Sequence, residues 1–318
     1  MNELVKSNKI QTFAVRYIMY ALLIIMILFL SIQSDKFLTM ANVMTVLRQI
    51  SIQSIVAIGM TMIIILAQID LSVGSIVAFS TVINALALKA GLPVPVAFVV
   101  TLVGGALWGA FAGTVIARFQ VHAFLVTLAL MTGVRGIAYF LTGGYPIGGV
   151  PKEFNQISGG FLGPVPYPVI YMILIYAFFI YIMGFTAFGR SIYAIGGNKE
   201  SARLSGINVQ AVTIQVFMVS SMLSALAGFL LSSRLIAGSP DAAQGWEMDV
   251  IAATVIGGTS MYGGAGKLQG TIVGMLFIGV LSNGMVLMSI SPYMQDVIKG
   301  VVILLAVILN SLQSRKSR

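Results

Sequence analysis

Long stretches without charge are the feature that most limits what this chain can fold into. No Asp, Glu, Lys or Arg occurs from Phe154 to Gly189, from Leu204 to Ser233 or from Leu268 to Gln295. About 20 predominantly apolar residues are enough to cross the hydrocarbon core of a bilayer. Charged residues make up 8% of the chain, against about 25% in soluble domains, and cannot cover a surface in water. We therefore predict an all-α bundle that crosses a membrane several times.

Hydropathy along the chain predicts about ten transmembrane helices in a single domain, residues 1–318. The first residues are too polar for a signal peptide and Tyr17 onward lacks a cleavage site of small residues, so the first apolar segment is expected to remain as a span. The predicted spans are 17–34, 49–68, 71–88, 94–117, 122–143, 165–184, 212–235, 249–265, 269–289 and 293–312.

The distribution of basic residues predicts the orientation. Ten spans place both termini on one side, and lysine and arginine are enriched in cytoplasmic loops. Cytoplasmic termini put 11 basic residues inside and four outside, so we take the net charge of +9 as a topology signal and predict no nucleic-acid binding. The inner residues are Lys6, Lys9, Arg16, Arg118, Arg190, Lys199, Arg203, Lys267, Arg315, Lys316 and Arg318, and the outer ones are Lys36, Arg48, Lys89 and Lys152.

Small residues recur at helical spacing and predict close helix packing. Gly105, Gly109 and Gly113 lie in "GALWGAFAG", a repeated small-xxx-small pattern that allows two helix backbones to approach closely. The contact is expected within this chain, with a contact to a second copy as the alternative. Gly257 and Gly270 belong to similar surfaces further along the chain.

Two segments of similar sequence raise the question of an internal repeat. "DLSVGSIVAFST" (Asp70 to Thr81) and "DVIAATVIGGTS" (Asp249 to Ser260) both begin with Asp, and a glycine-rich span follows each. The predicted topology places the two aspartates toward opposite faces, as an inverted repeat of a transport fold would. Chance similarity between apolar helices is the alternative.

Residues for enzyme chemistry are missing. The chain has no cysteine, and its single histidine, His122, fits an interfacial structural role better than a proton relay. "GGAGKL" (Gly263 to Leu268) departs from the phosphate-binding loop, because Met261 and Leu268 stand where that motif needs Gly and Ser or Thr. We therefore expect no catalytic residue, no metal site and no cofactor in this chain.

Polar residues inside predicted spans, or in the short break between two of them, are candidates for a translocation path, because a buried charge in a membrane is costly and faces a partner or water. Asp70, Arg135 and Asn283 are the three candidates. Arg135 has the alternative of extending its side chain to the interface. Asp296 and Lys299, three residues apart, are expected to form an ion pair on the last span.

The segment "YAIGGNKESARLSGINV" (Tyr193 to Val209) interrupts the apolar sequence between two spans. Asn198 is a favoured N-cap residue, and Glu200 would lie in the first turn of a short helix. Gly206 is placed to end that helix in the left-handed conformation. The sequence predicts a short, doubly capped helix on the cytoplasmic side, suited either to docking a partner or to connecting two spans.

The segment resembles the cytoplasmic coupling segment of bacterial ABC-importer permeases, in the ribose-type branch that takes up monosaccharides. "IDLSVGS" (Ile69 to Ser75), "FGRSIYAIGGNKESARLSGINV" (Phe188 to Val209), "VIGGTSMYGGAG" (Val255 to Gly266) and "SNG" (Ser282 to Gly284) carry this resemblance over nearly the whole chain. Lys199 departs from the pattern, which more often has an acidic or small residue there. The resemblance places an ATPase contact within residues 190–209, at Gly196, Gly197, Asn198, Glu200, Ala202, Leu204, Ser205 and Gly206.

The resemblance also implies partners and a location. It implies a second permease copy, two cytoplasmic ATPase subunits that hold ATP and Mg, and an extracytoplasmic sugar-binding protein. Membrane lipid would surround the chain, in the bacterial inner membrane. The expected function is inward transport of a monosaccharide or sugar-like solute, and the chain itself would not be an enzyme. An ion-coupled secondary transporter and a passive channel are the alternatives.

Overall fold

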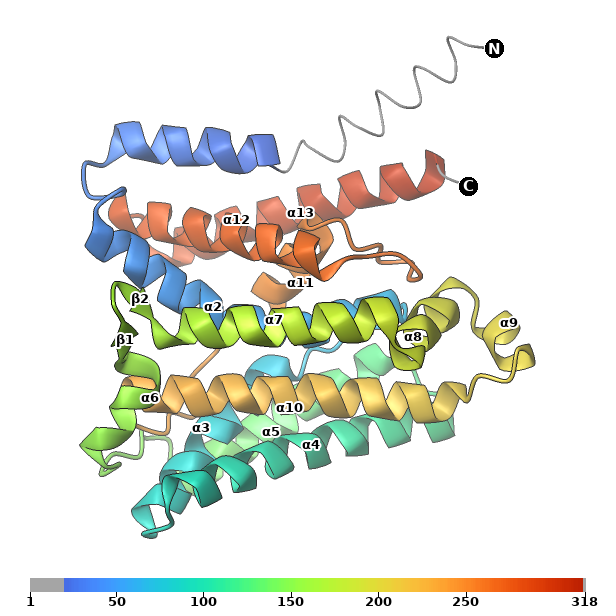
Figure 1. Ribbon diagram of the computed structural model, residues 1–318, viewed down its shortest axis with the longest axis horizontal. Helices are drawn as coiled ribbons and strands as arrows, with labels where there is room; N and C mark the ends of the chain where they lie inside the picture. The colour runs from blue at the N-terminus through green and yellow to red at the C-terminus, as the bar shows by residue number, and fades with distance from the viewer. Residues whose placement is uncertain (1–19, 317–318) are drawn as a thin grey trace.

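A computed structural model describes residues 20–316, with side chains described as far as residue 308. Figure 1 shows long helices running side by side, with two short helices projecting at one end. Lys6, Lys9, Arg16 and Arg318 lie outside the described residues. The helices are Tyr20–Gln33, α2 (Met40–Ile65), α3 (Val73–Lys89), α4 (Val94–Phe119), α5 (Ala123–Thr142), η1 (Lys152–Asn155), α6 (Gln156–Gly159), α7 (Tyr167–Phe185), α8 (Ala187–Gly197), α9 (Lys199–Leu204), α10 (Val209–Leu235), α11 (Trp246–Ile256), α12 (Leu268–Leu287) and α13 (Pro292–Lys316).

The all-α membrane bundle is confirmed, whereas the number of spans is not. Within the described residues, six helices are long and apolar enough to cross a membrane: α2, α4, α5, α7, α10 and α12. The helix Tyr20–Gln33 and α3 are apolar but shorter. β structure in the described part is limited to β1 (Phe161–Leu162) paired with β2 (Val165–Pro166), and one bridge between Ile147 and Gly238.

The predicted span 249–265 is wrong. Its helix, α11, ends at Ile256, and residues 257–267 form turns before α12 begins. Gly258, Gly263 and Gly264 have positive φ angles there, which favour turns over a continuing helix. Hydropathy therefore predicts a transmembrane helix over residues 249–265, although the glycines in this run end the helix half-way.

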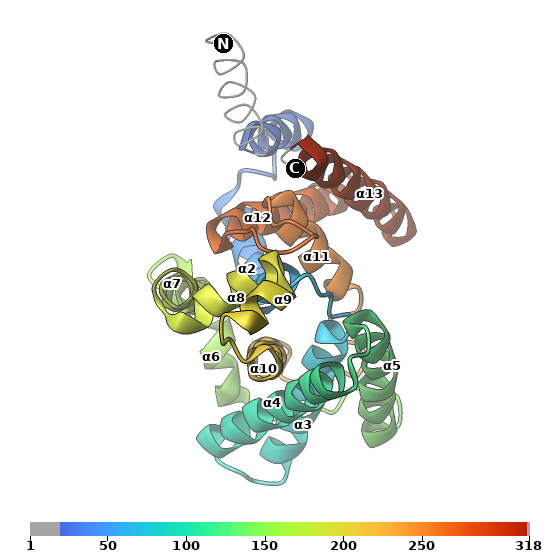
Figure 2. The ribbon, with the colours of Figure 1, turned by 90° about the vertical axis from the view of Figure 1, so that its right-hand side faces the viewer.

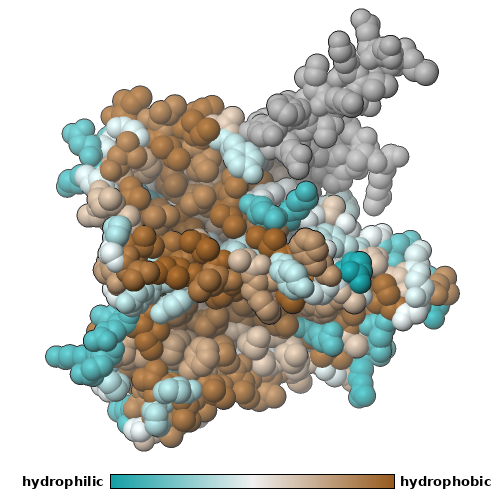
Figure 3. Space-filling view, viewed as in Figure 1, coloured by the Kyte–Doolittle hydropathy of each residue, from teal (hydrophilic) through white to brown (hydrophobic). Residues whose placement is uncertain are grey.

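α2 forms the centre of the bundle. Every residue from Ile50 to Ile65 is buried, and α10, α12, α7 and α11 all pack against the helix (Figure 2). A helix that is apolar on all sides is expected to be surrounded by protein or lipid. The helices further out instead expose apolar side chains such as Leu107 on α4 and Phe178 on α7. Figure 3 shows this apolar surface along the bundle, with hydrophilic residues gathered toward its two ends.

The glycine ridge of α4 packs within this chain, as expected. A Cβ atom on Gly105, Gly109 or Gly113 would meet the backbone of α10 at Ser221, Met218 or Ile214. Gly257 and Gly270 face one another in the same way where α11 meets α12. The two helix pairs approach closely because these positions carry no side chain.

Gly109→Ala is expected to lower the thermal stability of the purified protein. The added Cβ would lie 2.7 Å from the Met218 Cα and closer still to the Phe217 carbonyl oxygen, and backbone cannot rotate away as a side chain can. Overpacking of this kind costs about 1–3 kcal/mol. Gly104→Ala is the matched control, because its Cβ would meet only Phe79, at 3.7 Å. Equal melting temperatures for the two variants in detergent would contradict the packing.

Candidate functional site

Two short helices, α8 and α9, project from one end of the bundle (Figure 1). Thr186 caps α8 by accepting a hydrogen bond from the Gly189 amide at 3.2 Å. Asn198 ends α8 and caps α9, since its Oδ1 accepts a hydrogen bond from the Ser201 amide at 2.8 Å. The predicted N-cap at Asn198 is confirmed.

The end of α9 is also fixed by its backbone. Gly206 has a φ of +85°, and its amide donates to the Arg203 carbonyl at 3.0 Å. The following amide, that of Ile207, donates to the Ala202 carbonyl at 3.1 Å. This pattern satisfies carbonyls that a helix end leaves free, and it confirms the left-handed glycine that the sequence predicts.

The side chains of α9 differ sharply in exposure. Leu204 is 74% exposed, whereas Ala202 is 4% exposed and packs inside this chain. Glu200 and Arg203 form an exposed ion pair at 2.5 Å, and the hydrogen bond from Arg203 lowers the Glu200 pKa. Such a pair adds little stability in water. Of the predicted contact residues, Leu204 is thus available to a partner, and Ala202 instead holds α9 against the bundle.

The base of α8 fits tightly against two other segments. A Cβ on Gly196 would overlap the carbonyl oxygen of Ile65, the last residue of α2. The same oxygen accepts a hydrogen bond from the Gly264 amide at 2.9 Å, and the Tyr193 hydroxyl donates to the Gly266 carbonyl at 2.8 Å. We call this contact of α8, α2 and residues 257–267 the Gly196 junction. It brings together motifs that the sequence shows only as separate glycine-rich stretches.

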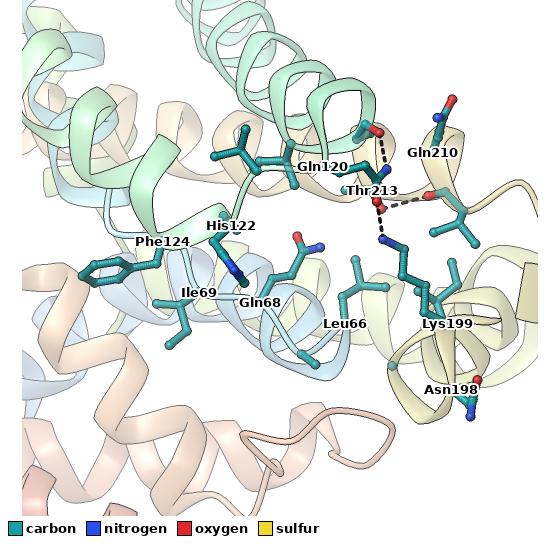
Figure 4. Close-up of a pocket in the computed structure, with 18 of the residues that line it drawn as sticks. Leu66, Gln68, Ile69, Gln120, His122, Phe124, Asn198, Lys199, Gln210 and Thr213 are labelled. Atoms are coloured by element: carbon teal, nitrogen blue, oxygen red, sulfur yellow. Dashed lines mark hydrogen bonds between the residues drawn. The ribbon is translucent and has the colours of Figure 1, made fainter. Parts of the chain in front are cut away.

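A pocket of about 530 Å³ lies behind α9, between the ends of α2, α4 and α8 and the starts of α5 and α10 (Figure 4). We call it the α9 pocket. Lys199 bridges it, because its Nζ donates to Gln120 Oε1 at 3.0 Å; the sequence had not predicted this contact. The residues that line it include Leu66, Gln68, Ile69, Gln120, His122, Asn198, Lys199, Gln210 and Thr213.

The three predicted path residues do not come together. Asp70 is fully buried, and its Oδ1 accepts hydrogen bonds from the Ser72 amide (2.8 Å) and hydroxyl (2.6 Å) just before α3. Asn283 forms a reciprocal amide pair with Asn42, at 2.8 and 3.0 Å, and so joins α12 to the start of α2. Both polar groups of Asn283 are engaged there, and its place on the path stays a prediction.

Arg135 holds an irregular segment inside the bundle. After α10, residues 236–245 run back along α3 before α11 begins. Arg135 Nη1 donates to the carbonyls of Pro240 (3.0 Å) and Ala242 (2.9 Å), and Thr81 Oγ1 accepts from the Ser239 amide at 3.0 Å. Non-helical backbone is tolerated at membrane depth only where protein or a water-filled cavity supplies hydrogen-bond partners for its N–H and C=O groups. Arg135 is therefore engaged with protein and does not extend to the interface.

The starts of two short helices, α3 and α11, meet beside this segment. A Cβ on Gly74, in the first turn of α3, would touch the carboxylate of Glu247, in the first turn of α11. Interrupted helices whose N-termini meet inside the bundle are typical of transport folds. The inverted repeat itself stays a prediction.

Comparison with known families decides what kind of protein carries this site. The family described as "Branched-chain amino acid transport system / permease component" matches residues 42–307. The chain belongs to this permease family. It is therefore a multi-pass membrane protein and a component of a transporter.

Curated relatives cover almost the whole permease. It is 42% identical over 290 residues to the ribose import permease protein RbsC of Haemophilus influenzae, over 90% of each chain. It is 40% identical to RbsC of Bacillus subtilis, over 92% of this chain and 91% of that one. It is 35% identical to the xylose transport system permease protein XylH of Escherichia coli, over 98% and 94% of the two chains. No solved structure matches. The predicted resemblance to ribose-type permeases is confirmed.

The permease also contains an ion pair that the sequence places wrongly. Lys299 Nζ lies 3.1 Å from Asp249 Oδ1, and Gln53 Nε2 donates to the other oxygen of Asp249 at 3.5 Å. Asp296, the predicted partner of Lys299, is exposed. The actual pair forms because α11 packs against α13, a contact between distant segments that residue spacing along one helix cannot reveal. The only sequence signal for this pair was Asp249 itself, an aspartate in a predicted span that would need a partner there.

Proposed function

We propose that this permease is the membrane subunit of an ATP-binding-cassette importer that moves a monosaccharide into the cell. The observation that carries the proposal is identity of 40–42% over at least 90% of the chain to permeases that import ribose. The xylose permease at 35% identity supports a pentose in particular. The family description mentions branched-chain amino acids, but these relatives are sugar permeases, so we favour a sugar. An ion-coupled secondary transporter is not favoured.

The proposal includes an orientation. Arg190 and Lys267 line one small pocket near α8, and α4 ends with Arg118 beside the α9 pocket. The basic residues that the sequence assigns to the cytoplasm therefore gather at the α9 end. Together with the positive-inside rule, this supports placing that end and both termini in the cytoplasm.

In this orientation α9 faces the compartment that contains ATP. We propose that α9 docks into a separate ATPase subunit, which supplies the hydrolysis, and that an extracytoplasmic binding protein delivers the sugar to the opposite end. A second permease copy would complete the importer. Support for the docking comes from the two caps, which fix the shape of α9, and from Leu204, which the described residues leave 74% exposed.

Leu204→Asp is expected to release the ATPase and to abolish uptake. A carboxylate buried without a partner in an interface costs several kcal/mol, and 1.4 kcal/mol weakens binding about tenfold. The side chain makes little contact within the permease, so insertion and folding should remain normal. The measurement is co-purification of the ATPase subunit with the permease, together with ribose and xylose uptake in cells.

The matched control is Leu162→Asp, at a leucine that is also largely exposed (65%), on the hairpin at the opposite end. It should keep the ATPase bound. If Leu204→Asp retained the ATPase and transported like the wild type, α9 would be a connector and not a docking helix.

A further inference from the structure

The α9 pocket contains a hydrogen-bonding group that the chain leaves unused. Gln68 Oε1 is buried and has no hydrogen-bond partner within the described residues. Figure 4 shows the Gln68 side chain directed into the pocket, opposite His122. A buried acceptor without a donor costs about 1–3 kcal/mol. The cost is removed when a ligand donates a hydrogen bond.

The backbone on two sides of this pocket has an uncommon conformation. Ala67, which precedes Gln68, has a φ of +57°, and Gln120 across the pocket has a φ of +55°. Residues other than glycine rarely adopt this conformation, and it costs about 1–2 kcal/mol at each position. Strained positions of this kind gather at binding sites. Both belong to the lining of the same pocket.

The side chains that line the α9 pocket indicate which class of ligand it can bind. Gln68, Gln120, Gln210 and Thr213 offer neutral amides and a hydroxyl, and the described residues that line the pocket include no aspartate or glutamate. Leu66 and Ile69 supply apolar surface beside them. Sites for small molecules combine such apolar walls with a few convergent polar groups, in pockets of about 300–1,000 Å³. A neutral molecule with several hydroxyl groups fits this lining, whereas a cation would meet Lys199.

We infer that the α9 pocket binds a monosaccharide from the cytoplasmic side, with Gln68 accepting a hydrogen bond from a sugar hydroxyl. The inference rests on the proposed function for its ligand and its orientation. The pocket is walled on one side by α8 and the start of α9, and the Lys199–Gln120 hydrogen bond crosses it. A sugar bound there contacts the same short helices that we propose dock the ATPase.

Binding to the purified permease in detergent tests the site without the ATPase or the external binding protein. The probes are radiolabelled D-ribose and D-xylose, with L-leucine as a probe of a different class. Sugar binding is expected, and Gln68→Leu should weaken it about tenfold, the effect of losing one well-placed hydrogen bond. Gln49→Leu, an exposed glutamine on α2 and outside the pocket, is the control and should bind like the wild type.

A second measurement covers the case in which Gln68→Leu fails to fold. The chain has no cysteine, so Gln210→Cys introduces a single thiol at the pocket, and an excess of ribose should slow its reaction with a maleimide. Gln49→Cys should react at the same rate with and without ribose. Unchanged labelling of Gln210→Cys, or equal binding by Gln68→Leu and the wild type, overturns the site even if the complete importer takes up sugar. Absence of sugar uptake by the complete importer would instead overturn the proposed function.

Discussion

Lys299→Met is expected to lower the free energy of unfolding by about 3–5 kcal/mol, the usual cost of removing one partner from a buried ion pair. Asp249 is buried on α11, and Lys299 is the cation that faces its carboxylate. Methionine keeps the length and the apolar part of the lysine side chain but removes the charge. Thermal unfolding in detergent measures the loss.

Two further variants separate the lost pair from other effects. In the double variant with Asp249→Asn, the uncompensated charge disappears, and most of the stability should return. Asp296→Asn removes an exposed carboxylate on α13, the helix of Lys299, and should change the free energy of unfolding little. An Asp296→Asn variant that unfolded as early as Lys299→Met would show that the pair assigned here is not the important one.

Gly196→Ala is expected to reduce sugar uptake tenfold or more, to well below the uptake of Gly197→Ala. A Cβ on Gly196 would overlap the carbonyl oxygen of Ile65 and lie 2.7 Å from the Gly264 amide nitrogen. Both neighbours are backbone atoms, so α8 must move away from α2 and the Gly196 junction must open. A Cβ on Gly197 would meet nothing within 4 Å, and alanine favours a helix more than glycine does.

The adjacent pair of glycines makes this a controlled comparison, because the substitution and the helix are shared. Uptake of radiolabelled ribose in cells is the measurement, with the amount of permease in the membrane as the check on folding. Equal uptake by the two variants would show that the close contact at Gly196 plays no part in transport.

Local sequence predicted the local structure of this permease well. Asn198 and Gly206 act through hydrogen bonds within a few residues, so their types and spacing were enough to place both caps of α9. The ridge of Gly105, Gly109 and Gly113 was equally legible, because a repeat of small residues on one helix face serves mainly for close packing.

Contacts between distant segments were beyond such reasoning. Asn283 was expected on a translocation path, and its amide pair with Asn42 was not foreseen; Lys299 was expected to pair with Asp296, yet it pairs with Asp249. Glu247 and Gln68 were not predicted as site residues, because a single polar residue forms no periodic pattern in the sequence. Hydropathy also overestimated the helix at α11, because it scores glycine-rich turns and helices alike. A polar group in apolar surroundings pairs with another polar group, and the tertiary fold determines which residue supplies that partner.

The position of α2 gives the permease a mechanical property. Its 26 residues at about 1.5 Å each reach about 39 Å, the full depth of a bilayer. One end carries the Gly196 junction and the other the Asn42–Asn283 amide pair. From Ile50 to Ile65 the helix is enclosed by close-packed neighbours, and such an interior resists compression and transmits strain. We therefore expect α2 to move as a rigid helix. A force on α8 at one face of the membrane would then displace Asn42 at the other face along the helix axis, without any change in the helix itself.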